Sequence, residues 1–175
     1  MRLISLIAIL LLQSVSALHA KDVVFVGHIT DEKNNYLSDV KISINQQVVY
    51  TNKRGEFKLS ANQQPVYQLK FSKRGYYTAI QSFSDFELSA QLTSEKQIRS
   101  IALVEKVDGR VMLSFGGDVM MGRRFSKPKF NNPVLIHQQS KAQDTKFITR
   151  QVKPYLSIAD YAAVNLETQI SHERP

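Results

Sequence analysis

Residues 56–75 read EFKLSANQQPVYQLKFSKRG, and this stretch decides the fold of the first half of the chain. Apolar side chains alternate with polar ones, first at Phe57 and Leu59 and then at Tyr67, Leu69 and Phe71. A period of two residues places one set of side chains inward and the other outward, which is typical of a half-buried β-strand. The same period recurs at Ile42 and Ile44, so we expect a further short strand before residues 56–75.

Turn signals separate these runs. Polar clusters follow the successive apolar runs at residues 31–35, 52–55 and 73–75, and we expect Gly55 and Gly75 to adopt positive φ in tight turns. Residues 84–96 are polar and are expected to form a loop before a last strand at residues 98–104. About seven short strands at this spacing predict an antiparallel β-sandwich over residues 21–105.

This segment resembles the carboxypeptidase regulatory-like (transthyretin-like) family. The likeness rests on four stretches: Val26-Gly27-His28-Ile29-Thr30-Asp31, Leu37-Ser38-Asp39-Val40-Lys41-Ile42, Thr51-Asn52-Lys53-Arg54-Gly55-Glu56-Phe57 and Phe71-Ser72-Lys73-Arg74-Gly75-Tyr76. The resemblance implies the β-sandwich fold and an accessory module that is attached to many partners, and it implies no chemistry by itself.

The N-terminus predicts export. Met1 and Arg2 precede an apolar run from Leu3 to Leu12, and small residues follow, with cleavage expected after Ala17 or Ala20. Residues 1–20 are therefore read as a signal peptide, with an uncleaved anchor as the alternative, and the mature chain is expected in the periplasm or at the cell surface. Membrane contact is expected only through this segment. The chain has no cysteine, so neither disulfides nor a lipid-modified cysteine can form.

The formal net charge of +8 favours polyanionic partners. The basic residues are scattered, with no Lys/Arg run longer than two, so a generally solvated basic surface is the other reading. Export argues against nucleic acid as the partner.

From Arg110 onward the pattern changes. Residues 111–115 are nearly continuously apolar, which predicts a strand buried on both faces of a parallel sheet. Residues 126–140 are expected to form a loop, and apolar residues from Phe147 to Leu156 fall near helical spacing, with Pro154 kinking this helix or beginning a second one. A second apolar strand is expected at residues 161–164. The order strand, helix, strand predicts a βαβ unit.

Polar residues follow each of these two strands: Asp118 follows the first, and Asn165 and Glu167 follow the second. Ligands of parallel sheets bind at the carboxyl ends of strands, where these side chains would meet. Two converging carboxylates repel each other, and a divalent cation removes the conflict. Asn165 could add a neutral oxygen ligand. The alternative for Asp118 alone is an ordinary turn or helix cap.

The two blocks together resemble the CapA-like capsule synthesis family of poly-γ-glutamate proteins, which is metallophosphatase-like. They are Gly117-Asp118-Val119-Met120-Met121-Gly122-Arg123 and Ala159-Asp160-Tyr161-Ala162-Ala163-Val164-Asn165-Leu166-Glu167-Thr168. The resemblance implies a divalent metal (Mn, Fe or Zn) held by Asp118, Asn165 and Glu167, with Glu167 the stronger second ligand. By the same resemblance Arg123 would face an anionic substrate group, with a solvated arginine that opens a loop or helix as the alternative. Asp160 would cap or align the start of a strand.

The resemblance covers residues 110–175, which would be the N-terminal part of a larger α/β domain whose further blocks lie beyond Pro175. It implies an exported protein that makes, attaches or trims an anionic capsule or cell-surface polymer, with other capsule-assembly proteins as further expected partners. The reaction would be metal-assisted hydrolysis or transfer, and residues 1–175 alone are expected to be inactive. The alternative is a non-enzymatic envelope protein that binds polymer through the β-sandwich.

Overall fold

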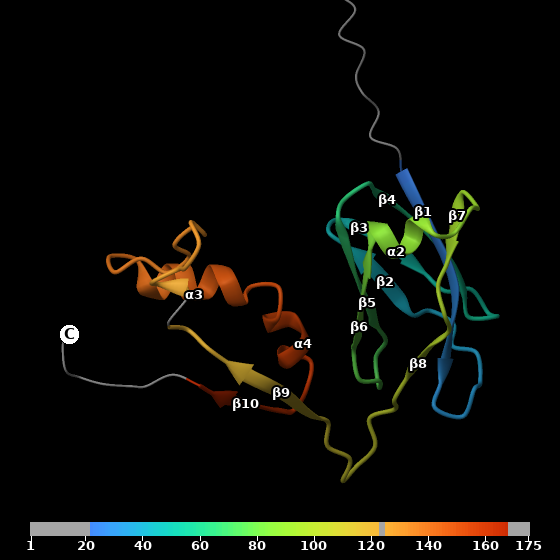
Figure 1. The fold of residues 1–175 in the computed structure, drawn as a ribbon. Helices are drawn as coiled ribbons and strands as arrows, with labels where there is room; N and C mark the ends of the chain where they lie inside the picture. The colour runs from blue at the N-terminus through green and yellow to red at the C-terminus, as the bar shows by residue number, and fades with distance from the viewer. Residues whose placement is uncertain (1–21, 123–124, 168–175) are drawn as a thin grey trace, which may run out of the picture.

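The computed structural model describes residues 22–122 and 125–167 (Figure 1). The expected signal peptide and Arg123 lie outside these residues. Two sheets form a sandwich, and a separate strand pair with two helices follows it. The expected β-sandwich is confirmed. In the part of the chain that the structure describes, no helix is both long and apolar enough to cross a membrane.

The first sheet of the sandwich is built around β1 (Asp22–Asp31). It pairs antiparallel with β4 (Glu56–Asn62) and parallel with the short strands β7 (Glu95–Gln97) and β8 (Ile101–Leu103). The expectation of a purely antiparallel sandwich is therefore wrong at β7 and β8. The chain crosses from the second sheet back to the first before β7, and this crossover lets the two short strands run alongside β1 in its own direction.

The second sheet is antiparallel throughout, in the order β3-β2-β5-β6. Its strands are β2 (Lys41–Ile44), β3 (Gln47–Tyr50), β5 (Val66–Ser72) and β6 (Ala79–Ser84). The alternating residues of both sheets meet in one core, whose largest fully buried side chains are Tyr67, Phe25, Phe71, Ile29, Ile42, Leu59, Leu69, Leu103 and Val40. The period-two pattern therefore predicted the inward face correctly.

Two glycine turns behave as expected, with φ of +69° at Gly55 and +83° at Gly75. Gly55 is also sterically required, because a Cβ there would lie 2.5 Å from the carbonyl oxygen of Ile29. The turn that leads from β3 of the second sheet into β4 of the first can therefore approach β1 closely only with glycine at this position.

The polar segment 84–96 is not simply a loop, because it contains the helix α2 (Asp85–Ser89) and the beginning of β7. Ser84 and Glu87 form a capping box: the Ser84 hydroxyl accepts from the Glu87 amide at 3.1 Å, and the Glu87 carboxylate accepts from the Ser84 amide at 2.8 Å. Leu88 is buried beneath the helix. The spacing of Ser84 and Glu87 signals a helix start that the polar composition hides.

The second module contains β9 (Leu113–Val119), α3 (Lys141–Thr149), α4 (Lys153–Ser157) and β10 (Tyr161–Leu166). Pro154 stands in the first turn of α4, so it begins a second helix rather than kinking the first. β9 and β10 pair in parallel, as expected for a βαβ unit. A turn joins the two modules, with the Arg110 amide donating to the Val107 carbonyl at 3.1 Å.

The two modules are joined by hydrogen bonds around Asp160. Its carboxylate accepts from the Met112 amide at 2.8 Å and from the hydroxyl of Tyr77, a buried side chain of the sandwich, at 2.9 Å. Its own amide donates to the Met112 carbonyl at 3.0 Å. Asp160 thus aligns the start of β10 with β9, as expected, and also fastens the pair to the sandwich. The Met112 amide and then the Tyr77 hydroxyl lower the pKa of Asp160.

Asp160→Asn is expected to destabilise the protein in a pH-dependent way. Because the folded-state pKa is lowered, the stabilisation by Asp160 is present above the ordinary aspartate pKa of about 3.9 and is lost as pH falls through the lower folded value. Thermal unfolding followed by circular dichroism should show a lower Tm for Asp160→Asn at neutral pH and convergence with the unmodified protein in acid. Asp108→Asn, in the exposed inter-module turn, is the control. An equal deficit at both pH values would contradict this account.

Candidate metal centre at the carboxyl end of β9 and β10

The carboxyl ends of β9 and β10 lie at one edge of a parallel pair. Asp118 pairs with Asn165, and the Asn165 side-chain amide donates to the Asp118 carboxylate at 2.6 Å. The ladder continues one step further, with the Glu167 amide donating to the Val119 carbonyl at 3.1 Å. Asp118 and Asn165 therefore meet at this edge, and Glu167 follows. The approach of the Asp118 and Glu167 carboxylates stays a prediction.

A β-bulge in β9 produces this meeting. Phe115 pairs with Ala163, but the next matched pair is Asp118 with Asn165, so Gly116 and Gly117 together lie opposite Val164. Without the extra residue, Asp118 would lie opposite Leu166 and point to the other face of the pair. The bulge thus moves Asp118 onto the face that carries Asn165. Glu167 lies just beyond the end of β10, where its amide still continues the ladder by donating to the Val119 carbonyl.

Gly116 makes the bulge possible. A Cβ at this position would lie 2.8 Å from Cγ1 of Val164, whereas at Gly117 it would meet open space. The apolar run predicted a strand over residues 111–115. Instead, the strand continues to Val119 and the glycines lie inside it. Glycine within a strand is a known signal of a bulge, and that signal was present in the sequence.

The donor set fits a divalent cation only in part. Asp118 and Glu167 offer carboxylate oxygens, and Asn165 holds one Asp118 oxygen through its amide nitrogen. Within residues 22–122 and 125–167, no group of three or more histidine, cysteine or acidic side chains is placed to bind a metal. Oxygen donors suit hard cations such as Mg²⁺ or Mn²⁺, which need further ligands or water to complete their shell. Asn165 orients the carboxylate in this geometry.

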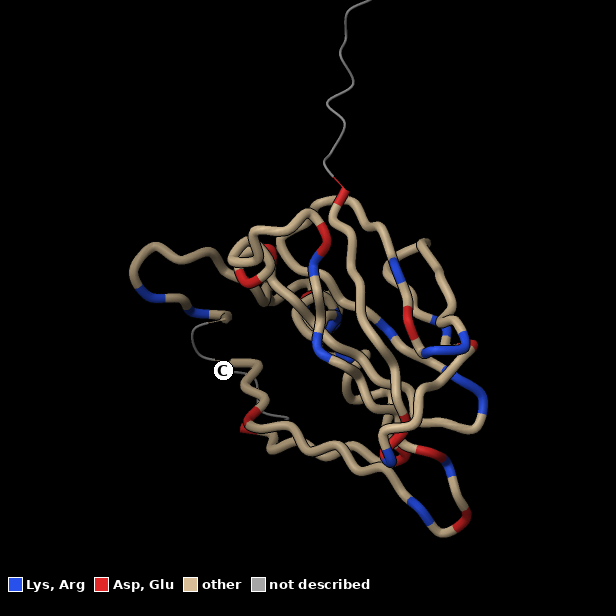
Figure 2. Tube along the Cα trace, turned by 90° about the vertical axis from the view of Figure 1, so that its right-hand side faces the viewer, with Lys and Arg blue, Asp and Glu red and all other residues tan. Residues whose placement is uncertain are grey.

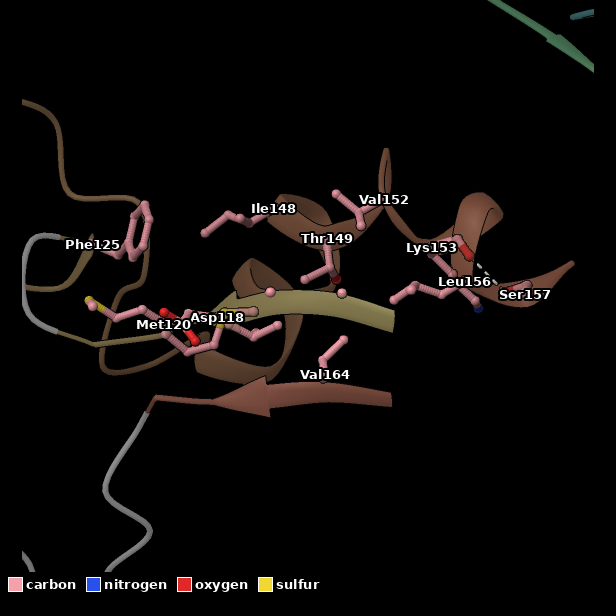
Figure 3. A pocket seen from close by; sticks show the side chains of 14 residues that line it. Asp118, Met120, Phe125, Ile148, Thr149, Val152, Lys153, Leu156, Ser157 and Val164 are labelled. Atoms are coloured by element: carbon pink, nitrogen blue, oxygen red, sulfur yellow. Dashed lines mark hydrogen bonds between the residues drawn. The ribbon is translucent and has the colours of Figure 1, made fainter. Parts of the chain in front are cut away.

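A cavity of about 600 Å³ lies between β9 and the helices, and Asp118 stands at its rim (Figure 3). Ile148, Thr149 and Val152 face the strand across this space. The remaining lining is largely apolar and includes Met120, Met121, Phe125, Leu156 and Val164. The helices therefore cover this face of the pair loosely, which the sequence did not indicate.

The face of the pair that points away from the helices is bare, and by alternation it is the face that Tyr161 shares with Asn165. Leu113, Phe115 and Tyr161 are 56%, 77% and 69% exposed. The expectation that residues 111–115 are buried on both faces is thus wrong for the described chain. The described helices α3 and α4 lie on the other side of the pair (Figure 1). Apolar exposure of this kind is typical of a sheet surface that another layer covers.

A second polar cluster joins His137, Ser140 and Asp144, the residue types of a nucleophilic triad. Here the Ser140 hydroxyl donates to the Asp144 carboxylate at 2.8 Å, and the His137 ring lies 3.1 Å from the same carboxylate oxygen. The His137 amide also donates to this oxygen, at 2.8 Å. The serine is bonded to the acid rather than to the histidine, so the cluster fastens the loop to the start of α3 and activates no nucleophile.

Comparison with known proteins adds no functional assignment. No family model and no curated protein matches the sequence. Among solved structures, a chain of a cohesin–X-dockerin complex from Acetivibrio cellulolyticus is similar at 15% identity and TM-score 0.38. The match covers 53% of this chain and 74% of that chain. A 3-chlorocatechol 1,2-dioxygenase from Rhodococcus opacus matches 50% of this chain and 61% of its own, at 11% identity and TM-score 0.39.

A third solved structure is a putative membrane-associated protein of unknown function from Bacteroides fragilis. It matches 52% of this chain and 30% of its own, at 21% identity and TM-score 0.36. This chain therefore spans only part of the length of each of these proteins, and the sandwich assignment rests on its own strand pairing.

Proposed function

We propose that this chain is an exported, CapA-like protein that acts on an anionic capsule or cell-surface polymer through a divalent-metal centre at the carboxyl end of β9 and β10. The observation that carries the proposal is the bulge at Gly116 and Gly117, which brings Asp118 onto the face of Asn165. A bulge beside a polar strand end is a device that re-aims a side chain at functional sites. The capsule role itself rests on the resemblance of the two sequence blocks.

The bare face of the strand pair supports a larger sheet in the functional protein, as do its outer edges, beside which no described strand pairs. Leu113, Phe115 and Tyr161 are the side chains that a further layer would cover. Additional strands beside β9 or β10 would bring more ligands to the same edge, which the incomplete donor set requires. On this proposal the described pair supplies the first ligands of the centre.

The bound cation would supply a Lewis acid that activates water and neutralises negative charge at a phosphate or amide. Asp118 would hold it directly, and Asn165 would fix the carboxylate by donating to its other oxygen. Glu167 would approach from the end of β10. Arg123, by the same proposal, would pair with an anionic group of the substrate.

Asp118→Ala is expected to abolish or greatly weaken cation binding. Loss of a residue that only orients a ligand typically costs tenfold to 100-fold in affinity, so loss of a ligand should cost at least about 100-fold. Titration calorimetry with Mn²⁺ on the purified chain measures this, and Asp108→Ala in the exposed inter-module turn is the matched control. Stoichiometric Mn²⁺ binding that survives Asp118→Ala would rule out the proposed centre.

The alternative function is polymer binding by the sandwich without catalysis. It is favoured by the distribution of the core, since every member of the main buried cluster lies between Phe25 and Leu103. Residues 21–105 should therefore fold when expressed alone. Retention of polymer binding by this module, together with no Mn²⁺ binding by the full chain, would favour the alternative.

A further inference from the structure

The outward face of the second sheet carries an unbalanced positive charge. Along β2, β3 and β5, the side chains that alternate with the core residues point outward: Lys41, Ser43, Val48, Tyr50, Gln68 and Lys70. We call these six residues the outer face. Figure 2 shows that basic positions are otherwise spread along the trace rather than gathered in one run. The outer face is therefore defined by strand pairing rather than by a basic sequence run.

The two lysines of the outer face lie near each other without an acidic neighbour. Ser43 pairs with Lys70 and Lys41 pairs with Ser72, so Lys41 and Lys70 are diagonal neighbours, about 7–8 Å apart at the backbone. No outward position of β2, β3, β5 or β6 holds an acid. By contrast, Arg54, Lys58 and Arg110 each form an ion pair. Like charges on neighbouring strands repel each other and so lower the stability of the sheet. An anionic ligand that binds both lysines would remove this repulsion.

An apolar strip lies beside these charges. Tyr50 is 62% exposed and pairs with Lys41, and Val48 is 42% exposed and pairs with Ser43. An exposed tyrosine ring next to a lysine offers both a flat apolar surface and a cation. The apolar faces of sugar rings match such a surface, and their carboxylates match the lysines.

The positive charge continues onto the helices. The Gln68 side chain donates to the Gln151 carbonyl at 3.5 Å, and Ser82 of β6 contacts Tyr155 of α4, so the segment joining α3 and α4 lies beside the outer face (Figure 1). Residues 141–157 contain four basic side chains, Lys141, Lys146, Arg150 and Lys153, and a single acidic one, Asp144. The Asp144 carboxylate is already hydrogen-bonded by His137 and Ser140. Gln68 is adjacent to Lys70 on the outer face, and Gln151 follows Arg150, so the two basic regions adjoin.

We propose that the outer face binds an acidic polysaccharide. Lys41 and Lys70 pair with successive carboxylates, Tyr50 packs against a sugar ring, and Arg150 extends the contact toward the second module. The inference rests on the proposed function for the anionic character of the polymer, and it places polymer binding on the sandwich, remote from Asp118. A polyanion without rings would use the lysines but leave Tyr50 and Val48 uncovered.

The test measures binding of the full chain to polygalacturonate, with the neutral polymer dextran and with poly-L-glutamate as comparisons. Because losing one exposed ion pair weakens binding by up to about fivefold, Lys41→Glu with Lys70→Glu should weaken polygalacturonate binding by roughly tenfold. Salt should weaken binding of the unmodified chain in the same way. The matched control is Lys127→Glu with Lys129→Glu, which changes the net charge equally in an exposed loop of the second module. This control should bind nearly as well as the unmodified chain.

Tyr50→Ala tests the sugar contact, with Tyr36→Ala as its control, since Tyr36 is 60% exposed and lies outside the outer face. We expect Tyr50→Ala to lose affinity for polygalacturonate and Tyr36→Ala to keep it. The Tm of both variants should equal that of the unmodified chain. Equal losses in the two lysine pairs, or tight binding of poly-L-glutamate without polygalacturonate, would overturn the inference. Mn²⁺ titration of the same lysine variants separates the two proposals, because their metal binding should be unaffected.

Discussion

Phe25→Ala is expected to unfold the sandwich or leave it barely stable. Phe25 is fully buried on β1 and packs edge-on against Tyr67, with ring centroids 5.1 Å apart, and lies 6.1 Å from the ring of Phe83. Removing a buried phenylalanine ring costs about 3–5 kcal/mol, because the protein loses the transfer free energy of the ring and also pays for the cavity that is left. Domains of this size are stabilised by only about 5–15 kcal/mol in total. The loss therefore removes a large share of the stability.

Urea unfolding followed by circular dichroism measures this effect. Phe86→Ala is the matched control, because Phe86 is 87% exposed on α2, and its free energy of unfolding should change by no more than about 0.5 kcal/mol. Similar losses in both variants would mean that the core does not lie between the two sheets as described.

Gly116→Ala is expected to displace Asp118 and thereby to abolish the candidate metal centre. The new Cβ would meet Cγ1 of Val164 at 2.8 Å, and the branched Val164 side chain has little freedom to move away. Overpacking of this kind costs about 1–3 kcal/mol, and the strand can relieve it by giving up the bulge. Asp118 would then pair with Leu166 and leave the face of Asn165.

Two further variants make this prediction specific. Gly117→Ala should be tolerated, because nothing lies within 4 Å of its added Cβ. The double variant Gly116→Ala with Val164→Ala should recover Mn²⁺ binding, since it removes the clashing methyl group. Mn²⁺ affinity and Tm measured on the three proteins check both statements. Equal loss in Gly116→Ala and Gly117→Ala would contradict a specific role for the bulge.

The sequence predicted the sandwich because alternation is a local property of each strand. Leu69 and Phe71 were recognised as inward residues from their polar neighbours alone. The parallel pairing of β7 and β8 with β1 was not predictable in this way, because it depends on where a distant segment returns. The short helix α2 could have been predicted from Ser84 and Glu87, because side chains at this spacing accept from each other's backbone amides at the start of a helix.

The candidate site was predictable only in part. Parallel pairing of two apolar segments was enough to bring Asp118 and Asn165 to one edge. The face of the strand pair on which each side chain lies could not be predicted, because a one-residue bulge moves the side chains that follow it to the other face. The prediction that residues 111–115 are buried was wrong for a different reason. An apolar side chain such as Phe115 favours apolar surroundings, but its exposure depends on which other elements pack against it.

The most direct measurement is anomalous X-ray diffraction from crystals of the chain grown with Mn²⁺. The account predicts an anomalous peak at the carboxyl end of β9 and β10, within about 2.0 to 2.6 Å of an Asp118 carboxylate oxygen and with Glu167 on the same side. A map without a peak at this edge, or carboxylates of Asp118 and Glu167 on opposite faces of the strand pair, would contradict it.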